Sequence, residues 1–146
     1  MLKLYKLGLL TISALGFVFL AGCSGNNAPQ IDESTWAITT IQSAEAEGQI
    51  VACSSDDSEV FENAIEVNFE CTAEEGELSL IDKMEDKTYT GSYSLLSSNR
   101  ESSIYKITLD GTEGTAVSSS TTYNDGNQIP TLIVSLGDYT LNFLAE

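Results

Sequence analysis

The sequence predicts an all-β fold, an antiparallel up-and-down meander of about eight strands with one short helix or loop over an end. Apolar and polar residues alternate with period two along most of the chain after residue 34. Turn dipeptides such as Asp110-Gly111, Asp125-Gly126 and Gly137-Asp138 interrupt this alternation at short intervals. Because short connections join antiparallel neighbours, the resulting sheet must either split into two layers or close on itself.

The clearest expected strand covers residues 65–71, where Ile, Val, Phe and Cys alternate with Glu and Asn. In residues 56–64, by contrast, Val60, Phe61 and Ala64 fall on one helical side behind a run of acids. This segment predicts the short helix, with a plain solvated loop as the alternative. The other expected strands cover residues 36–39, 78–80, 89–95, 105–109, 117–123, 131–136 and 139–143.

The N-terminus combines two lysines in residues 1–6, an uncharged apolar run over residues 7–20, and the tetrapeptide Leu20-Ala21-Gly22-Cys23. This arrangement resembles the lipobox of bacterial lipoproteins. The resemblance implies a signal peptide over residues 1–22, diacylglycerol and a fatty acyl group such as palmitate on Cys23, and a lipid-anchored place on the extracytoplasmic face of a cell membrane. The alternative is a permanent transmembrane anchor, but a span needs ~20 apolar residues and this run is shorter.

Removal of residues 1–22 from the 146-residue chain leaves 124 residues, which suits a tether over residues 23–33 and one domain over residues 34–146. Lys3 and Lys6 are two of the six basic residues, so four remain against 22 acidic ones and the formal charge of this part is −18. Such a surface repels phosphates, which argues against a nucleic-acid partner. The charge indicates either a soluble, self-avoiding monomer or attraction of a basic protein partner.

Two further cysteines, Cys53 and Cys71, follow the lipobox cysteine. An even pair in a protein outside the cytoplasm favours a disulfide, which would add ~3 kcal/mol by restricting the unfolded chain. Two buried free thiols are the alternative, because the sequence does not show whether the residues are close.

The sequence contains no histidine, which removes the commonest general base and transition-metal ligand. It also lacks the Gly-rich phosphate loop and the Gly-x-Ser-x-Gly turn. The acidic segments 56–59 and 124–127 do not match the spaced calcium loop, and a helix start and a hairpin turn account for them better. We therefore expect no catalytic residue, no metal and no cofactor besides the lipid on Cys23.

Four further features stand out in the domain: Trp36 in the first strand, the Gly91-Ser92-Tyr93 segment, Asp125-Gly126 before a Pro-bearing strand, and the terminal segment 137–143. With these features the domain as a whole resembles small bacterial lipoproteins with a lipocalin-like β-barrel. The resemblance implies that the meander closes into a small lipocalin-like barrel.

A barrel of about eight strands is either filled by its side chains or holds one small ligand. Aromatic residues on the inward-facing stripes are the candidates to line such a space: Trp36, Phe69, Tyr89, Tyr93, Tyr105, Tyr139 and Phe143. Two functions follow as hypotheses, namely binding of a small apolar or amphipathic ligand, or engagement of a basic cell-envelope protein by a filled acidic barrel, as an inhibitor would.

Overall fold

Residues 28–146 are the part of the chain that the structure, a computed structural model, describes. The leader, the lipobox and Cys23 lie outside these residues. The elements are η2 (Ile31–Glu33), β1 (Trp36–Ser43), β2 (Gln49–Cys53), η3 (Ser55–Asp57), β3 (Ile65–Glu66), β4 (Phe69–Glu74), β5 (Glu77–Asp82), β6 (Lys87–Ser98), β7 (Ser102–Leu109), β8 (Thr112–Thr122), β9 (Gln128–Leu136) and β10 (Tyr139–Ala145).

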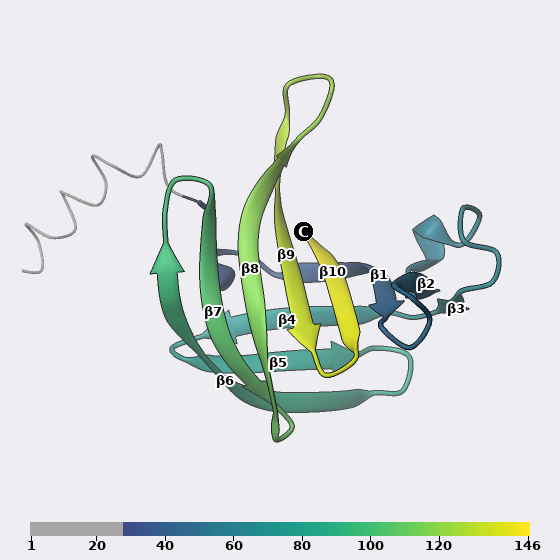
Figure 1. The fold of residues 1–146 in the computed structure, drawn as a ribbon, viewed down its shortest axis with the longest axis horizontal. Helices are drawn as coiled ribbons and strands as arrows, with labels where there is room; N and C mark the ends of the chain where they lie inside the picture. The colour runs from purple at the N-terminus through teal and green to yellow at the C-terminus, as the bar shows by residue number, and fades with distance from the viewer. Residues whose placement is uncertain (1–27) are drawn as a thin grey trace, which may run out of the picture.

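Eight of the strands close into an antiparallel barrel. The order is β10-β9-β8-β7-β6-β5-β4-β1, and pairing of β10 with β1 completes the ring. Strands β2 and β3 lie outside it, on the right in Figure 1, where β2 pairs with β1 and β3 runs parallel to β2. The predicted all-β meander of about eight strands, closed into a barrel, is confirmed, and its shape is consistent with a small lipocalin-like barrel.

The hairpin turns follow the predicted chemistry. Asp110 and Gly111 have φ of 49° and 80°, as a two-residue turn with both residues left-handed requires, and Gly137 has φ of 57°. Elsewhere two neighbouring strands lie too close together for a side chain to fit between them. A Cβ built on Gly91 would lie 1.7 Å from the Thr108 carbonyl oxygen, so β6 and β7 approach closely only because residue 91 is glycine.

The segment between β1 and β4 differs from the expectation. Residues 65–71 do not form one strand, because the ladder breaks at residues 67–68, where the backbone N–H of Val67 donates to the Cys53 carbonyl oxygen at 2.9 Å. The expected helix over residues 56–64 is only the single 3-10 turn η3 followed by turns. Ser54 precedes this turn, and its hydroxyl bonds the Asp57 carboxylate at 3.0 Å. Strand β2 has no counterpart among the expected strands.

The core fills one end of the barrel, and the N-terminal segment closes that end. Ile31 is fully buried, and Ala28 retains only 4% of its exposure. A flexible tether was expected over residues 23–33, but residues 28–33 are part of the folded domain. The apolar Ile31 packs into the barrel, which holds this stretch against it. Among residues 28–146 no helix has the length and apolar character needed to cross a bilayer.

Candidate functional site

The closed end is fixed by hydrogen bonds between the N-terminal segment and the barrel. The Tyr105 hydroxyl accepts from the Ile31 N–H at 3.1 Å and donates to Gln30 Oε1 at 3.0 Å. The indole Nε1–H of Trp36 donates to the Ile31 carbonyl oxygen at 2.8 Å. Ser118, buried on β8, donates its hydroxyl to the Pro29 carbonyl oxygen. Because these buried polar groups are paired, the segment can seal the barrel without an unsatisfied donor.

The opposite end is open and holds an apolar cavity of about 650 Å³. Four connections lie at this end, those between β1 and β2, β5 and β6, β7 and β8, and β9 and β10, and the last two lie at the bottom of Figure 1. The wall consists mainly of aliphatic and aromatic side chains: Ile41, Val51, Ala52, Ile65, Val67, Phe69, Leu80, Tyr89, Leu109, Leu136, Tyr139 and Leu141. Ser43, Asp110 and Thr112 are its polar members. The volume falls within the range of small-molecule sites.

The cavity forms because the barrel wall opens beside β1. Strand β4 pairs with β1 over Trp36 and Ala37 only, and β2 takes its place from Thr40 onward. A bulge between Ile38 and Thr40 shifts the register of β1. The side chains of Val51 and Ile65 from the two extra strands therefore join the wall at this seam.

The seven candidate lining residues separate into two groups. Phe69, Tyr89 and Tyr139 line the cavity, and Tyr139 stands at its mouth with 51% of its surface exposed. The remaining four belong to the filled end or pack against it: Trp36, Tyr93, Tyr105 and Phe143. The rings of Tyr93 and Tyr105 meet edge to face with centroids 5.9 Å apart. Sequence reasoning missed the aliphatic wall, although the alternating apolar residues of β7, β9 and β10 signal inward positions.

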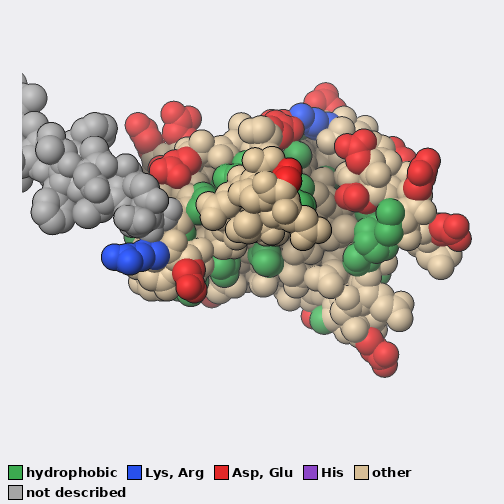
Figure 2. Space-filling view, turned by 90° about the horizontal axis from the view of Figure 1, so that it is seen from above, with side chains coloured by type: hydrophobic (Ala, Val, Ile, Leu, Met, Phe, Trp, Pro, Cys, Tyr) green, Lys and Arg blue, Asp and Glu red, His purple; other side chains and the backbone are tan. Residues whose placement is uncertain are grey.

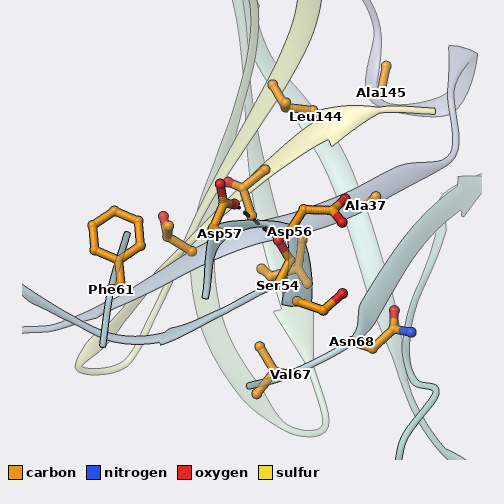
Figure 3. Close-up of a pocket in the computed structure, with 13 residues that line it drawn as sticks. Ala37, Ser54, Asp56, Asp57, Phe61, Val67, Asn68, Leu144 and Ala145 are labelled. Atoms are coloured by element: carbon orange, nitrogen blue, oxygen red, sulfur yellow. Dashed lines mark hydrogen bonds between the residues drawn. The ribbon is translucent and has the colours of Figure 1, made fainter. Parts of the chain in front are cut away.

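A second hollow of about 640 Å³ lies on the outer face of the barrel, between β1, the end of β10 and the η3 segment. Figure 3 shows its two carboxylates, Asp56 and Asp57, beside Ser54 and facing the aliphatic Leu144 and Ala145. Its lining mixes charged, polar and apolar groups in similar measure, unlike the mainly apolar wall of the barrel cavity. Among residues 28–146 no three acids or cysteines gather closely enough to hold a metal ion. The barrel cavity is therefore the better candidate site.

The predicted disulfide is absent. Cys53 and Cys71 are free, buried thiols, which is the arrangement that the sequence left open as the alternative. Along β1, Cys53 lies opposite Thr40 and Cys71 opposite Trp36. These positions are four residues apart, about 13 Å at ~3.3 Å per residue, whereas a disulfide needs Cα atoms within ~7 Å. The register of the two strands therefore prevents the bond.

Both thiols are held in the protonated form. Burial raises the pKa of Cys71 to about 12. Burial, together with the carboxylates of Asp57 and Glu66, raises the pKa of Cys53. Because the thiolate is the reactive form, neither cysteine is suited to nucleophilic or redox chemistry.

The surface is strongly acidic, and its bases are few. Figure 2 shows acidic side chains spread over the face it presents, without one concentrated patch. Lys83 forms an ion pair with Glu70, and the hydrogen bond that its ammonium donates to the Glu70 carboxylate raises the pKa of Lys83. Lys87 lies over the Tyr89 ring, with Nζ 4.7 Å from the ring centroid. These contacts engage two of the four basic residues between residue 28 and the C-terminus.

Comparison of the chain with protein-family models, with curated proteins and with solved structures finds no match.

Proposed function

We propose that this protein is a lipid-anchored extracytoplasmic binding protein that holds a small apolar or amphipathic ligand in the open end of its barrel. The supporting observation is the apolar cavity of about 650 Å³ beside a fully packed opposite end. A chain of this size gains stability by filling its core, because an unfilled apolar space loses packing contacts. A space of this size, confined to one end and lined by inward-facing leucines, is the arrangement that an apolar guest would complete.

The anchor would be Cys23, which the lipobox resemblance marks for lipidation. Ala28 is buried against the closed end, and the five steps of chain from Cys23 to Ala28 extend at most about 18 Å. The proposed anchor would thus hold the closed end near the bilayer. Strand β7 runs from Ser103 at the closed end to Leu109 at the cavity, so the mouth would face away from the membrane. The ligand would then enter from the aqueous side.

Ligand binding is tested by filling the cavity. The barrel closes and its core is complete within residues 28–146, so we expect this part to fold alone. Titration of this domain with the uncharged probe N-phenyl-1-naphthylamine should give saturable, blue-shifted fluorescence. Ala52 lines the cavity and is 7% exposed, so Ala52→Phe should weaken probe binding at least tenfold. Ser94→Phe, on an exposed position of β6, is the matched control and should bind normally.

Native mass spectrometry of the protein taken from membranes would show a bound small molecule. Equal probe binding by the wild type and Ala52→Phe, at equal thermal stability, would contradict the cavity as the site.

The anchor is tested by labelling the full chain with palmitate in a bacterial host. Incorporation should depend on Cys23, and Cys23→Ala should release the protein from the membrane fraction. Unlabelled wild-type protein would refute lipidation and leave the cavity proposal intact.

The second candidate function is engagement of a basic envelope protein by the acidic surface. The charge of −18 over the residues after position 22 favours it, but the acids form no concentrated patch in Figure 2. Association of a basic protein would weaken steeply with salt and would persist in Ala52→Phe. Persistence in that variant separates this function from ligand carriage.

A further inference from the structure

The mouth of the cavity carries acidic residues on each of the turns that surround it. Asp110 lies in the turn between β7 and β8 and lines the cavity itself. Asp138 begins the β10 side of the next turn, and its carbonyl oxygen accepts from the Ala44 N–H at 2.8 Å, which places the turn beside the β1–β2 connection. That connection contributes Glu45 and Glu47. The fourth connection at this end, between β5 and β6, contributes Glu85 and Asp86, and its one base, Lys83, forms an ion pair with Glu70.

The cavity wall offers no cation to an anionic headgroup. Asp110 is the one charged residue among the residues that line it. Lys87 is exposed on β6, and its charged Nζ lies over the ring of Tyr89, a residue of the cavity wall. A carboxylate at the mouth would meet acids on four connections, whereas an ammonium group would meet several partners of opposite charge.

From this charge complementarity we infer that the cavity selects single-chain amphiphiles with a positively charged headgroup, with the alkyl chain in the aliphatic wall and the cation between the acidic turns. The inference deepens the proposed function and rests on it. The alkyl chain supplies affinity through burial of apolar surface. The headgroup supplies discrimination, and its contribution is sensitive to salt because the carboxylates are exposed.

The test compares three ligands with the same chain, decylamine, decanol and decanoate, each in competition with N-phenyl-1-naphthylamine on the residue 28–146 domain. At pH 7 and ~10 mM salt we expect decylamine to bind about fivefold more tightly than decanoate, with decanol between them, from the ~0.2–1 kcal/mol of each exposed charge pair. At ~0.5 M salt the three affinities should converge, because the Debye length falls below ~5 Å.

Asp110→Asn separates the local effect from that of the overall charge. Asparagine tolerates the left-handed backbone of this position, where φ is 49°, so the turn should persist. We expect the ratio of decylamine to decanoate affinity to fall by about threefold. Glu101→Gln removes the same charge at the opposite end, in the short connection between β6 and β7, and should leave the ratio unchanged.

Lys87→Gln tests the opposite assignment. If Lys87 captured a carboxylate, decanoate would bind more tightly than decylamine and this variant would lose that preference, which would overturn the inference. Equal affinities of all three ligands at low salt would overturn it as well. Failure of every ligand and of the probe to bind would instead refute the proposed function on which the inference rests.

Discussion

The hydroxyl of Tyr105 is one of the contacts that hold the N-terminal segment in the barrel, and Tyr105→Phe removes that one group. Tyr105 is 3% exposed. Its hydroxyl accepts a hydrogen bond from the Ile31 N–H at 3.1 Å and donates one to Gln30 Oε1 at 3.0 Å. Without it, the N–H of the fully buried Ile31 has no partner, which costs about 1–3 kcal/mol. The second bond, which is partly buried, adds about 0.5–1 kcal/mol. We therefore expect a loss of about 2–3 kcal/mol in the free energy of unfolding.

The assay is urea unfolding of the residue 28–146 domain, followed by tryptophan emission. Trp36 is the single tryptophan, is fully buried at the closed end, and donates to Ile31, so its emission reports the state of this end directly. For a domain of this length, a loss of 2–3 kcal/mol lowers Tm by roughly 10 °C. Tyr139→Phe is the matched control, because Tyr139 is 51% exposed at the other end and should change stability by less than ~0.5 kcal/mol.

The reasoning would be refuted if Tyr105→Phe and Tyr139→Phe lost the same small amount of stability. In that case the N-terminal segment would not depend on this hydroxyl. A large loss in both variants would indicate that the open end is packed as tightly as the closed end, against the cavity described above.

Three further predictions concern the close backbone approach and the thiols. Gly91→Ala should destabilise the domain by about 3 kcal/mol in urea unfolding, because its Cβ would overlap the Thr108 carbonyl, while Ser92→Ala should change little. Cys53 and Cys71 should resist Ellman's reagent at pH 8 in the native domain and react as two thiols after unfolding without reductant; no reaction after unfolding would mean a disulfide. Since the folded pKa of Cys71 is raised from 9.0 to about 12, unfolded chains release this proton first, and stability should fall as pH rises from 9 to 12, by up to ~1.4 kcal/mol per pH unit. Cys71→Ala should reduce this loss, and the raised pKa of Cys53 should leave the remainder.

The hairpins of this fold could be predicted because their signals are local. The alternation of residues 105–109 fixes which side chains face inward, and Tyr105, Ile107 and Leu109 are all buried. The dipeptide Asp110-Gly111 then fixes the turn, because few other pairs accept two left-handed residues in succession. Neither inference needs to know what the rest of the chain does.

Strand β2 and the break at residues 67–68 could not be predicted in this way. Residues 50–53 are a continuous apolar run without alternation, so periodicity gives no sign of a strand there. Residues 65–71 do alternate. However, residues 65–66 pair with β2, whereas residues 69–71 pair with β5 and with the start of β1. Which strand takes which partner depends on the bulge in β1, and that is a property of the assembled barrel.

The candidate site could be predicted only in part, because it too depends on the assembled barrel. Inward-facing aromatic residues could be listed from the stripes, yet the end of the barrel that each would occupy depends on the N-terminal segment. Ile31 has no periodic signal of its own, being one apolar residue in a polar stretch. Once it packs against Trp36 and Tyr105, those rings become core, and the residues toward the opposite turns are left around the cavity.

This division of one barrel into two ends lets a small chain keep an unfilled space. The closed end contains the largest buried side chains, Trp36 and Phe143 among them, together with the paired polar groups of the N-terminal segment. The open end contributes less packing, so a guest there can add stability in proportion to its own binding, about 2.7 kcal/mol at a ligand concentration 100 times Kd. Substitutions at the two ends should therefore separate, with Tyr105→Phe changing the stability of the ligand-free domain and Ala52→Phe changing chiefly the stabilisation that a ligand provides.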